Sequence, residues 1–228
     1  MIALLCAVAV CVVVHLASAA LLAAILGIKV REASFGFGPV LARFGVVTLR
    51  LIPLGGFAKF KDSREEFIAP SDMHDAFDVQ PLATRLAIGA TGCLALLLVT
   101  MATLQLEGLR AFAGGFEQIV SGALSPLGEA QRLLAKIGTS TPTLPFTALL
   151  GFAAAKFAAF NLMPFPANNG GFMIANLFRN TPLQRRWSPA LTSLLTLAQL
   201  ALALSWIGAM LIYFIQPGTI DLDMLTGK

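Results

Sequence analysis

The sequence predicts a mostly α-helical membrane protein, with about four transmembrane helices, a short membrane-associated β-hairpin or small sheet, and surface helices. Of its 228 residues, 57% are hydrophobic and only 12% are charged, and the mean hydropathy is +0.80. A soluble domain of average composition carries about twice that share of charged residues. Four apolar stretches approach the ~20 residues that a helix needs to cross a bilayer; they are residues 1–28, 86–106, 146–163 and 190–215.

The first apolar stretch is interpreted as a retained transmembrane helix. Its residues 17–19, Ala-Ser-Ala, resemble the cleavage site of a secretory signal peptide. However, the stretch has no basic n-region, and its apolar character continues past these residues to Ile28. The cysteines lie inside apolar stretches without paired spacing and are interpreted as small buried residues; they are Cys6, Cys11 and Cys93.

Residues 29–60 are interpreted as a β-hairpin or a small re-entrant sheet that lies against the membrane or dips into it. Apolar, β-branched and glycine residues alternate there, with turn residues at 36–39 and 53–56. Because lipid offers no hydrogen-bond partner, the backbone must pair within the protein or with an added strand. Residues 61–80 are interpreted as a charged, solvated loop, and residues 108–145 as one or two amphipathic surface helices.

The positions of the basic residues predict the topology. Of the 16 lysines and arginines, eight lie between residues 29 and 85, and three lie between the third and fourth apolar stretches. Placing both segments in the cytoplasm follows the positive-inside tendency and puts both termini outside. No basic patch is interleaved with aromatic residues, so nucleic acid is not expected as a partner. In the charged loop, His74 lies among aspartates; an exposed polar loop is favoured, with a metal site as the alternative.

A single histidine, His15, interrupts the first apolar stretch. In a His-Glu-x-x-His pattern on a helix, two imidazoles one turn apart bind zinc, and the glutamate activates the zinc-bound water. The corresponding residues here are His15, Leu16 and Ala19. Only the first imidazole of the pattern is therefore present.

A second polar feature closes the third apolar stretch, where residues 160–171 read FNLMPFPANNGG. In an Asn-x-x-Pro-x-Pro-x-x-Asp-Gly-Gly turn, the aspartate would be the third zinc ligand. The prolines would stiffen the break, and the glycines would allow close backbone approach. The ligand position here is Asn169, and a neutral amide is a poor zinc ligand beside a single histidine.

Together these features resemble the site-2 protease family of intramembrane zinc metalloproteases. The resemblance rests on HLASA, on FGFGP with LIPLGGFAKF, on QPLATRLAIGATGCLALLL and on NLMPFPANNGG, in that order along the chain. It covers most of residues 1–178 and implies a single site-2-protease-like membrane domain over residues 1–228, of the compact kind that lacks a PDZ domain. It also implies an integral protein of a bacterial inner (plasma) membrane.

The departures from the family pattern fall on its catalytic positions. Of the family's site residues, His15 and Asn161 remain. The positions of the general base, the second zinc histidine, the zinc aspartate and the oxyanion asparagine hold, in that order, Leu16, Ala19, Asn169 and Leu96. Because zinc hydrolysis requires about three protein ligands, the sequence predicts a catalytically inactive member without a cofactor. The alternative is an active intramembrane protease with an atypical zinc site.

An inactive member is expected to bind transmembrane segments of other membrane proteins within the lipid bilayer, or to act as a regulatory or complex subunit. The resemblance implies a β-region whose edge accepts an unwound substrate as an added strand, and residues 46–52 have the required alternation. The predicted substrate-binding residues are Asn161, Val47, Thr48, Leu49, Arg50 and Leu51. His15 is interpreted as held by Asn169 or a buried water, with weak metal binding or a ligand pocket as the alternative.

Overall fold

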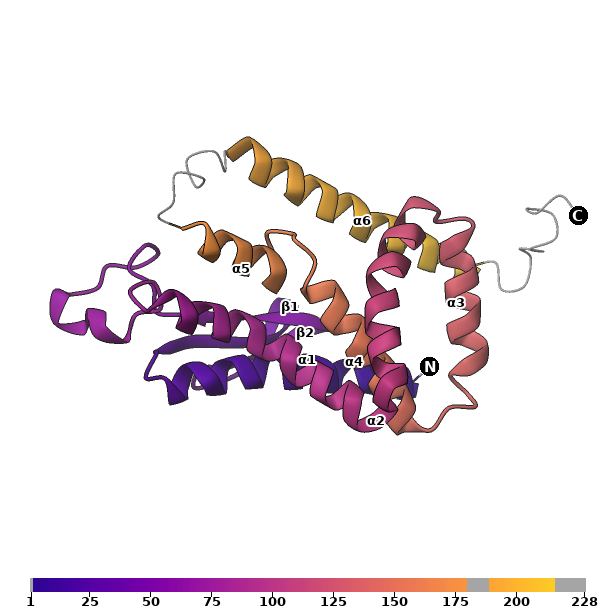
Figure 1. Cartoon of the computed structure of the whole chain (residues 1–228), viewed down its shortest axis with the longest axis horizontal. Helices are drawn as coiled ribbons and strands as arrows, with labels where there is room; N and C mark the ends of the chain where they lie inside the picture. The colour runs from indigo at the N-terminus through magenta and orange to yellow at the C-terminus, as the bar shows by residue number, and fades with distance from the viewer. Residues whose placement is uncertain (1, 180–188, 216–228) are drawn as a thin grey trace, which may run out of the picture.

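The computed structural model of the chain describes residues 2–179 and 189–215. Its fold is mostly helical with one small sheet, so the predicted fold class is confirmed (Figure 1). In chain order the elements are α1 (Ile2–Ile25), β1 (Val30–Phe44), β2 (Val47–Phe60), the 3-10 helix η1 (Pro70–Asp75), α2 (Leu82–Leu124), α3 (Glu129–Ser140), α4 (Phe146–Asn161), α5 (Asn169–Leu177) and α6 (Pro189–Ile215).

Three of the described helices, α1, α2 and α6, are long and apolar enough to cross a membrane, with 24, 43 and 27 residues. The third predicted span, residues 146–163, is correct in position but shorter than predicted. Its helix α4 has 16 residues, and is therefore about 24 Å long, below the ~30 Å of a hydrocarbon core. It ends at Asn161 because Pro164 and Pro166 cannot continue a helix.

Helix α2 consists of two sections that meet at Gln105, where the backbone has a positive φ of 52°. The first section contains the predicted second span, and Figure 1 shows the chain turning sharply into the second. The turn presses Gly108 onto Thr100, whose carbonyl oxygen would lie 2.8 Å from a Cβ at residue 108. Only glycine permits this approach. The second section and α3 are the helices predicted within residues 108–145.

Replacing Gln105 with glycine is expected to stabilise the protein by about 1 kcal/mol, because a positive φ costs a residue with a Cβ roughly that much. The same replacement at Gln118, inside the regular second section, is expected to destabilise by about 1 kcal/mol. Thermal unfolding in detergent, followed by circular dichroism, measures both changes. Destabilisation by both variants would contradict strain at Gln105.

The core between α1, α2 and α4 is built largely from small side chains. Cys11, Ala154 and Ala158 belong to one fully buried cluster. Small residues let helix backbones approach closely, which is how helices associate in lipid. The predicted burial of cysteine is confirmed for Cys11 and Cys93 and is wrong for Cys6, which is exposed.

The two long strands bend, so that each contributes two segments to the sheet. Residues 33–35 pair with residues 56–58 on one side and with residues 47–49 on the other. Residues 47–49 pair in turn with residues 42–44. Among the described residues, the two outer segments of the sheet are therefore 42–44 and 56–58.

The predicted free edge at residues 46–52 is wrong for residues 47–49, because these have a neighbour on each side. Thr48 and its partner Ser34 are both fully buried, as expected of inner strands. The sequence pattern could not show this, because alternation predicts a strand but not its place in a bent sheet. The edges of the sheet are instead the outer segments, residues 42–44 and 56–58.

Arg50, one of the predicted substrate-binding residues, is engaged inside the hairpin. Its guanidinium donates to the Ser34 hydroxyl at 2.7 Å, the Gly38 carbonyl at 3.0 Å and the Glu32 carboxylate at 3.0 Å. These bonds fix the bend of β1 against β2. Around them, large apolar side chains are exposed, which suits contact with lipid: Phe37, Val40, Leu41, Phe44, Val46, Leu49, Leu51 and Ile52.

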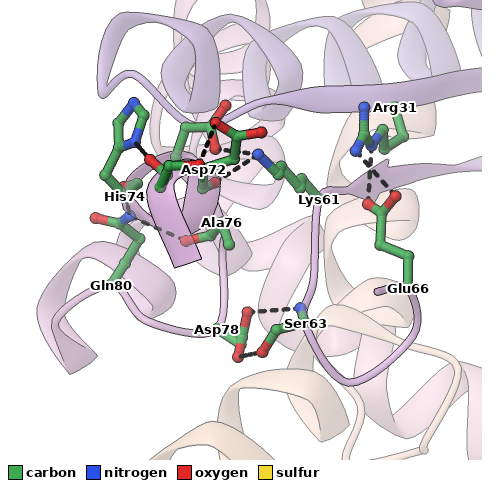
Figure 2. A network of polar contacts seen from close by, with 11 residues as sticks. Arg31, Lys61, Ser63, Glu66, Asp72, His74, Ala76, Asp78 and Gln80 are labelled. Carbon is green, nitrogen blue, oxygen red and sulfur yellow. Dashed lines mark hydrogen bonds and ion pairs between the residues drawn. The ribbon is translucent and has the colours of Figure 1, made fainter. Parts of the chain in front are cut away.

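The loop at residues 61–80 is charged, as predicted, but it is folded by its own polar contacts (Figure 2). Lys61 donates to the Asp75 carboxylate at 2.6 Å, and Ser63 donates to Asp78 from both its N–H and its hydroxyl. The hydrogen bond and charge of Lys61 hold the pKa of the Asp75 carboxyl below its usual value. The Asp75 carboxyl therefore stays ionised at neutral pH.

His74 lies at the exposed surface of this loop. Its Nδ1 is 3.2 Å from the Ser71 carbonyl, while Gln80 donates to the carbonyls of His74 and Ala76 (Figure 2). These bonds shape the turn around η1. They give His74 an ordinary structural setting, in line with the favoured interpretation of an exposed polar loop.

Helix α6 packs through its C-terminal half on α3 and on the second section of α2. Trp206 donates its indole N–H to the Ile119 carbonyl at 2.9 Å, and Gln131 of α3 donates to the Ala209 carbonyl at 3.0 Å. Nearer its N-terminus, α6 contacts the turn before α5, where Gln199 donates to the Asn168 side chain at 2.8 Å. The fourth predicted span is thus present as α6.

Candidate functional site

His15 lies on the inner face of α1 and is 6% exposed. Its Nε2 is 3.2 Å from the Oδ1 of Asn169, the first residue of α5. Asn169 in turn donates its Nδ2 to the Gly89 carbonyl of α2, at 2.5 Å. One hydrogen-bonded chain thus joins α1, α5 and α2, and the prediction that Asn169 holds His15 is confirmed.

Two residues that the sequence did not single out as site residues enclose the imidazole. A Cβ at Gly92 would lie 2.6 Å from the Nδ1 of His15, so a side chain there would displace the ring. The Phe157 ring meets the imidazole edge-on, with 5.7 Å between centroids. Among the described residues, the buried Nδ1 has no hydrogen-bond partner. Gly92 contacts α1 whereas Gly89 contacts α5, so their spacing is not the four-residue signal of a single close helix crossing.

The turn between α4 and α5 places Asn169 opposite His15. Asn168 donates its Nδ2 to the Phe160 carbonyl at the end of α4, at 2.6 Å, and accepts from Gln199 of α6. Its side chain therefore fixes the turn on both sides. Asn169 follows directly and begins α5, which directs its amide toward α1 and α2.

Two glycines let α5 begin directly against this turn. A Cβ at Gly170 would lie 2.5 Å from the Met163 carbonyl oxygen, and one at Gly171 would overlap the Phe165 carbonyl. These neighbours are backbone atoms, which cannot move aside as a flexible side chain does. The predicted role of the glycines in close backbone approach is confirmed.

Buried apolar side chains occupy the positions where the resemblance to site-2 proteases implies the general base, the second zinc histidine and the oxyanion residue. Leu16 is 5% exposed, and its Cδ1 would lie 2.5 Å from a Cβ at Gly56 of β2. Ala19 is 7% exposed. Leu96 belongs to the buried cluster between α1, α2 and α4. None of these three side chains has an atom that binds a metal or accepts a proton.

Asn161, the remaining predicted site residue, bonds to its own helix. Its Nδ2 donates to the Phe157 carbonyl at 2.8 Å. The structure therefore brings Asn169 to His15, whereas the Asn161 side chain bonds to the backbone at the end of its own helix, α4. Residues 47–51 lie in the sheet, and β2 reaches α1 at Gly56 and Leu16. Their role in substrate binding stays a prediction.

The groups around His15 do not fit zinc. They offer one imidazole and one neutral amide, whereas a zinc site uses about three protein ligands, with thiolate, imidazole or carboxylate groups. Over residues 2–179 and 189–215, no three or more His, Cys, Asp or Glu side chains are grouped so that they could hold a metal ion. The Nε2 of His15 and the Oδ1 of Asn169 are paired with each other.

Apolar helices long enough to span a membrane, a hairpin against the first of them, and a proline-containing turn that faces a helix histidine are the arrangement that the resemblance to site-2 proteases implies. The profile of Peptidase family M50 matches residues 3–205. The chain therefore belongs to Peptidase family M50, the site-2 protease family.

Several curated proteins are similar to parts of the chain. A putative zinc metalloprotease of Ralstonia nicotianae is 37% identical over 134 residues, which cover 53% of this chain and 28% of the relative. The regulator of sigma-E protease RseP of Escherichia coli is 39% identical over 71 residues, covering 29% and 16%. The probable membrane metalloprotease ARASP2 of Arabidopsis thaliana chloroplasts is 34% identical over 88 residues, covering 37% and 20%. The chain thus matches less than a third of the length of each relative.

Proposed function

We propose that this chain is a catalytically inactive member of family M50 that binds transmembrane segments of other membrane proteins, as a regulatory protein or complex subunit, without cutting them. The observation that carries the proposal is the hydrogen bond between His15 and Asn169. Residues at two zinc-ligand positions bond to each other, and the other catalytic positions hold Leu16 and Ala19. Zinc hydrolysis needs a metal-bound water and a general base, and these side chains supply neither.

The sheet edge nearest α1 is the proposed binding surface. Its outer segment, residues 56–58, reaches α1 where Gly56 meets Leu16. Ala33 pairs in register with Ala58 but donates its N–H to the Val46 carbonyl on the opposite side. In antiparallel strands, a pair that does not exchange hydrogen bonds points its polar groups outward. The N–H and C=O of Ala58 therefore point to where an added strand would bond.

A single-span peptide with a central Asn-Pro break and ¹³C-labelled carbonyls at that break tests this proposal. In lipid nanodiscs that hold the protein, the peptide is expected to bind, and its labelled carbonyls are expected to show the infrared amide frequency of a β-strand. Mass spectrometry of the recovered peptide is expected to find it uncut. Ala58→Pro removes the outward N–H and is expected to weaken binding about tenfold, the effect of roughly one lost hydrogen bond.

Ala58→Val is the matched control, because valine keeps the N–H and favours a strand. Equal peptide affinity of the proline and valine variants would show that the peptide does not bind at the edge formed by residues 56–58. Cleavage of the peptide by the unchanged protein, lost in His15→Ala, would establish the alternative function, an active protease with an atypical zinc site. Family membership is what favours that alternative.

The proposed setting is a bacterial inner membrane with both termini outside the cytoplasm. Support comes from the eight lysines and arginines between residues 29 and 85, which lie between two apolar spans. Basic residues that flank spans are enriched on the cytoplasmic side. In this orientation the folded loop at residues 61–80 and the start of α2 lie at the cytoplasmic surface.

A further inference from the structure

Phe67 lies in the charged loop at residues 61–80 and is 97% exposed. The residues on either side of it are held in place. Glu66 accepts two hydrogen bonds from the Arg31 guanidinium of β1, at 2.8 and 2.9 Å (Figure 2), and Ile68 is buried. The loop therefore presents a large aromatic side chain outward from a backbone that is fixed on both sides.

The contacts of this loop place Phe67 near the level at which α1 ends. Its neighbour Glu66 bonds to Arg31, six residues after the last residue of α1, Ile25. The loop also meets the chain directly after α1, where the Lys29 N–H donates to the Asp75 carbonyl at 3.1 Å. With 24 residues, α1 is about 36 Å long. This exceeds the ~30 Å of a hydrocarbon core, so the end of α1 lies among lipid headgroups.

Other apolar side chains are exposed at the same end of the spanning helices, just after α1 and at the start of α2; they are Leu26, Val79 and Leu82. Basic side chains accompany them. Lys29 is exposed and has no ion pair with the residues that the structure describes. Lys59 is paired with Glu65 at 3.2 Å, and both of these side chains are exposed. Apolar side chains mixed with lysines are typical of protein surfaces that lie in a headgroup layer.

We propose that Phe67 inserts into the phospholipid layer that surrounds the ends of α1 and α2, and that it attaches the charged loop to the membrane surface. Leaving an aromatic ring in water forgoes the free energy that its burial would release. Lipid is the partner that already lies at this level, and the lysines beside the ring complement its phosphates. Through the bonds of Glu66 to Arg31, the inserted ring would also hold β1 at a fixed depth.

The fluorescence of a Phe67→Trp variant in lipid nanodiscs tests the proposal. Phospholipids with brominated acyl chains quench a tryptophan from the lipid side, and acrylamide quenches it from water. Tryptophan keeps an aromatic ring at this position, and the unchanged protein gives the emission of Trp187 and Trp206 that is subtracted. The added emission is expected to lose most of its intensity in brominated lipid and little of it in acrylamide.

Ser71→Trp is the matched control, because Ser71 is an exposed polar residue of the same loop. Its emission is expected to be quenched by acrylamide and not by brominated lipid. Val13→Trp, at an exposed position in the middle of α1, gives the quenching expected inside the bilayer. Quenching of Phe67→Trp that matches Ser71→Trp would overturn the proposal and leave the ring free for a soluble protein partner. Emission protected from both quenchers would also overturn it, because the ring would then be packed on protein.

Discussion

Protein purified from membranes is expected to carry far less than one equivalent of zinc, and the triple change Leu16→Glu, Ala19→His and Asn169→Asp is expected to raise this to about one zinc per chain. The expected gain has a geometric basis. The side chain of residue 169 already contacts the Nε2 of His15, so an aspartate there would place its carboxylate beside the same imidazole nitrogen. Residue 19 lies one helical turn from His15 on the same face of α1, where a second imidazole completes the ligand set.

Elemental analysis of the purified proteins measures this zinc content. Adding His15→Ala to the triple variant is the control and is expected to remove the metal again. Because Leu16 is packed on Gly56, a glutamate there is the change most harmful to folding, so the double variant without it provides a second test of binding. Stoichiometric zinc in the unchanged protein, lost in His15→Ala, would contradict catalytic inactivity.

Replacing Gly171 with alanine is expected to have the largest effect on stability, a loss of several kcal/mol of the kind seen when a buried backbone site is overfilled. The new Cβ would overlap the Phe165 carbonyl, which is held inside the turn that carries Asn169. The start of α5 must then move, and the bond from Asn169 to His15 is expected to break with it.

Gly208→Ala in α6 is the matched control, because no atom of the residues that the structure describes lies within 4 Å of a Cβ there. Alanine favours a helix interior by up to about 1 kcal/mol over glycine, so this variant is expected to be slightly more stable. Thermal unfolding in detergent measures both. A Gly171→Ala protein as stable as the control would show that the turn can adapt to a side chain, and that glycine is not required at residue 171 to place Asn169 opposite His15.

The sequence predicted the helices and the hairpin well because composition and periodicity act locally. A run of apolar residues in α1, α2 or α6 predicts a span wherever it lies in the chain. The exceptions depend on particular neighbours. The two prolines after Asn161 shorten α4. The turn at Gln105 brings Gly108 against Thr100, a contact that no periodicity reveals.

The candidate site was predictable in its partners but not in its surroundings. The spacing of two motifs related His15 to Asn169, and the structure joins them. Gly92 and Phe157 were missed because a residue that touches an imidazole from another helix leaves no local pattern. The edge of the sheet was misplaced for a similar reason, since pairing order depends on how β1 and β2 bend.

The two-part anchoring of α6 has a mechanical consequence. Trp206 fixes its C-terminal half, while Gln199, seven residues earlier, holds the turn through Asn168. The helix therefore acts as a lever, and a rotation of about 10° at Trp206 moves Gln199 by about 2 Å. That displacement is enough to break a hydrogen bond of 2.8 Å. Because helices tilt when bilayer thickness changes, a tilt of α6 about Trp206 would displace the turn that holds His15.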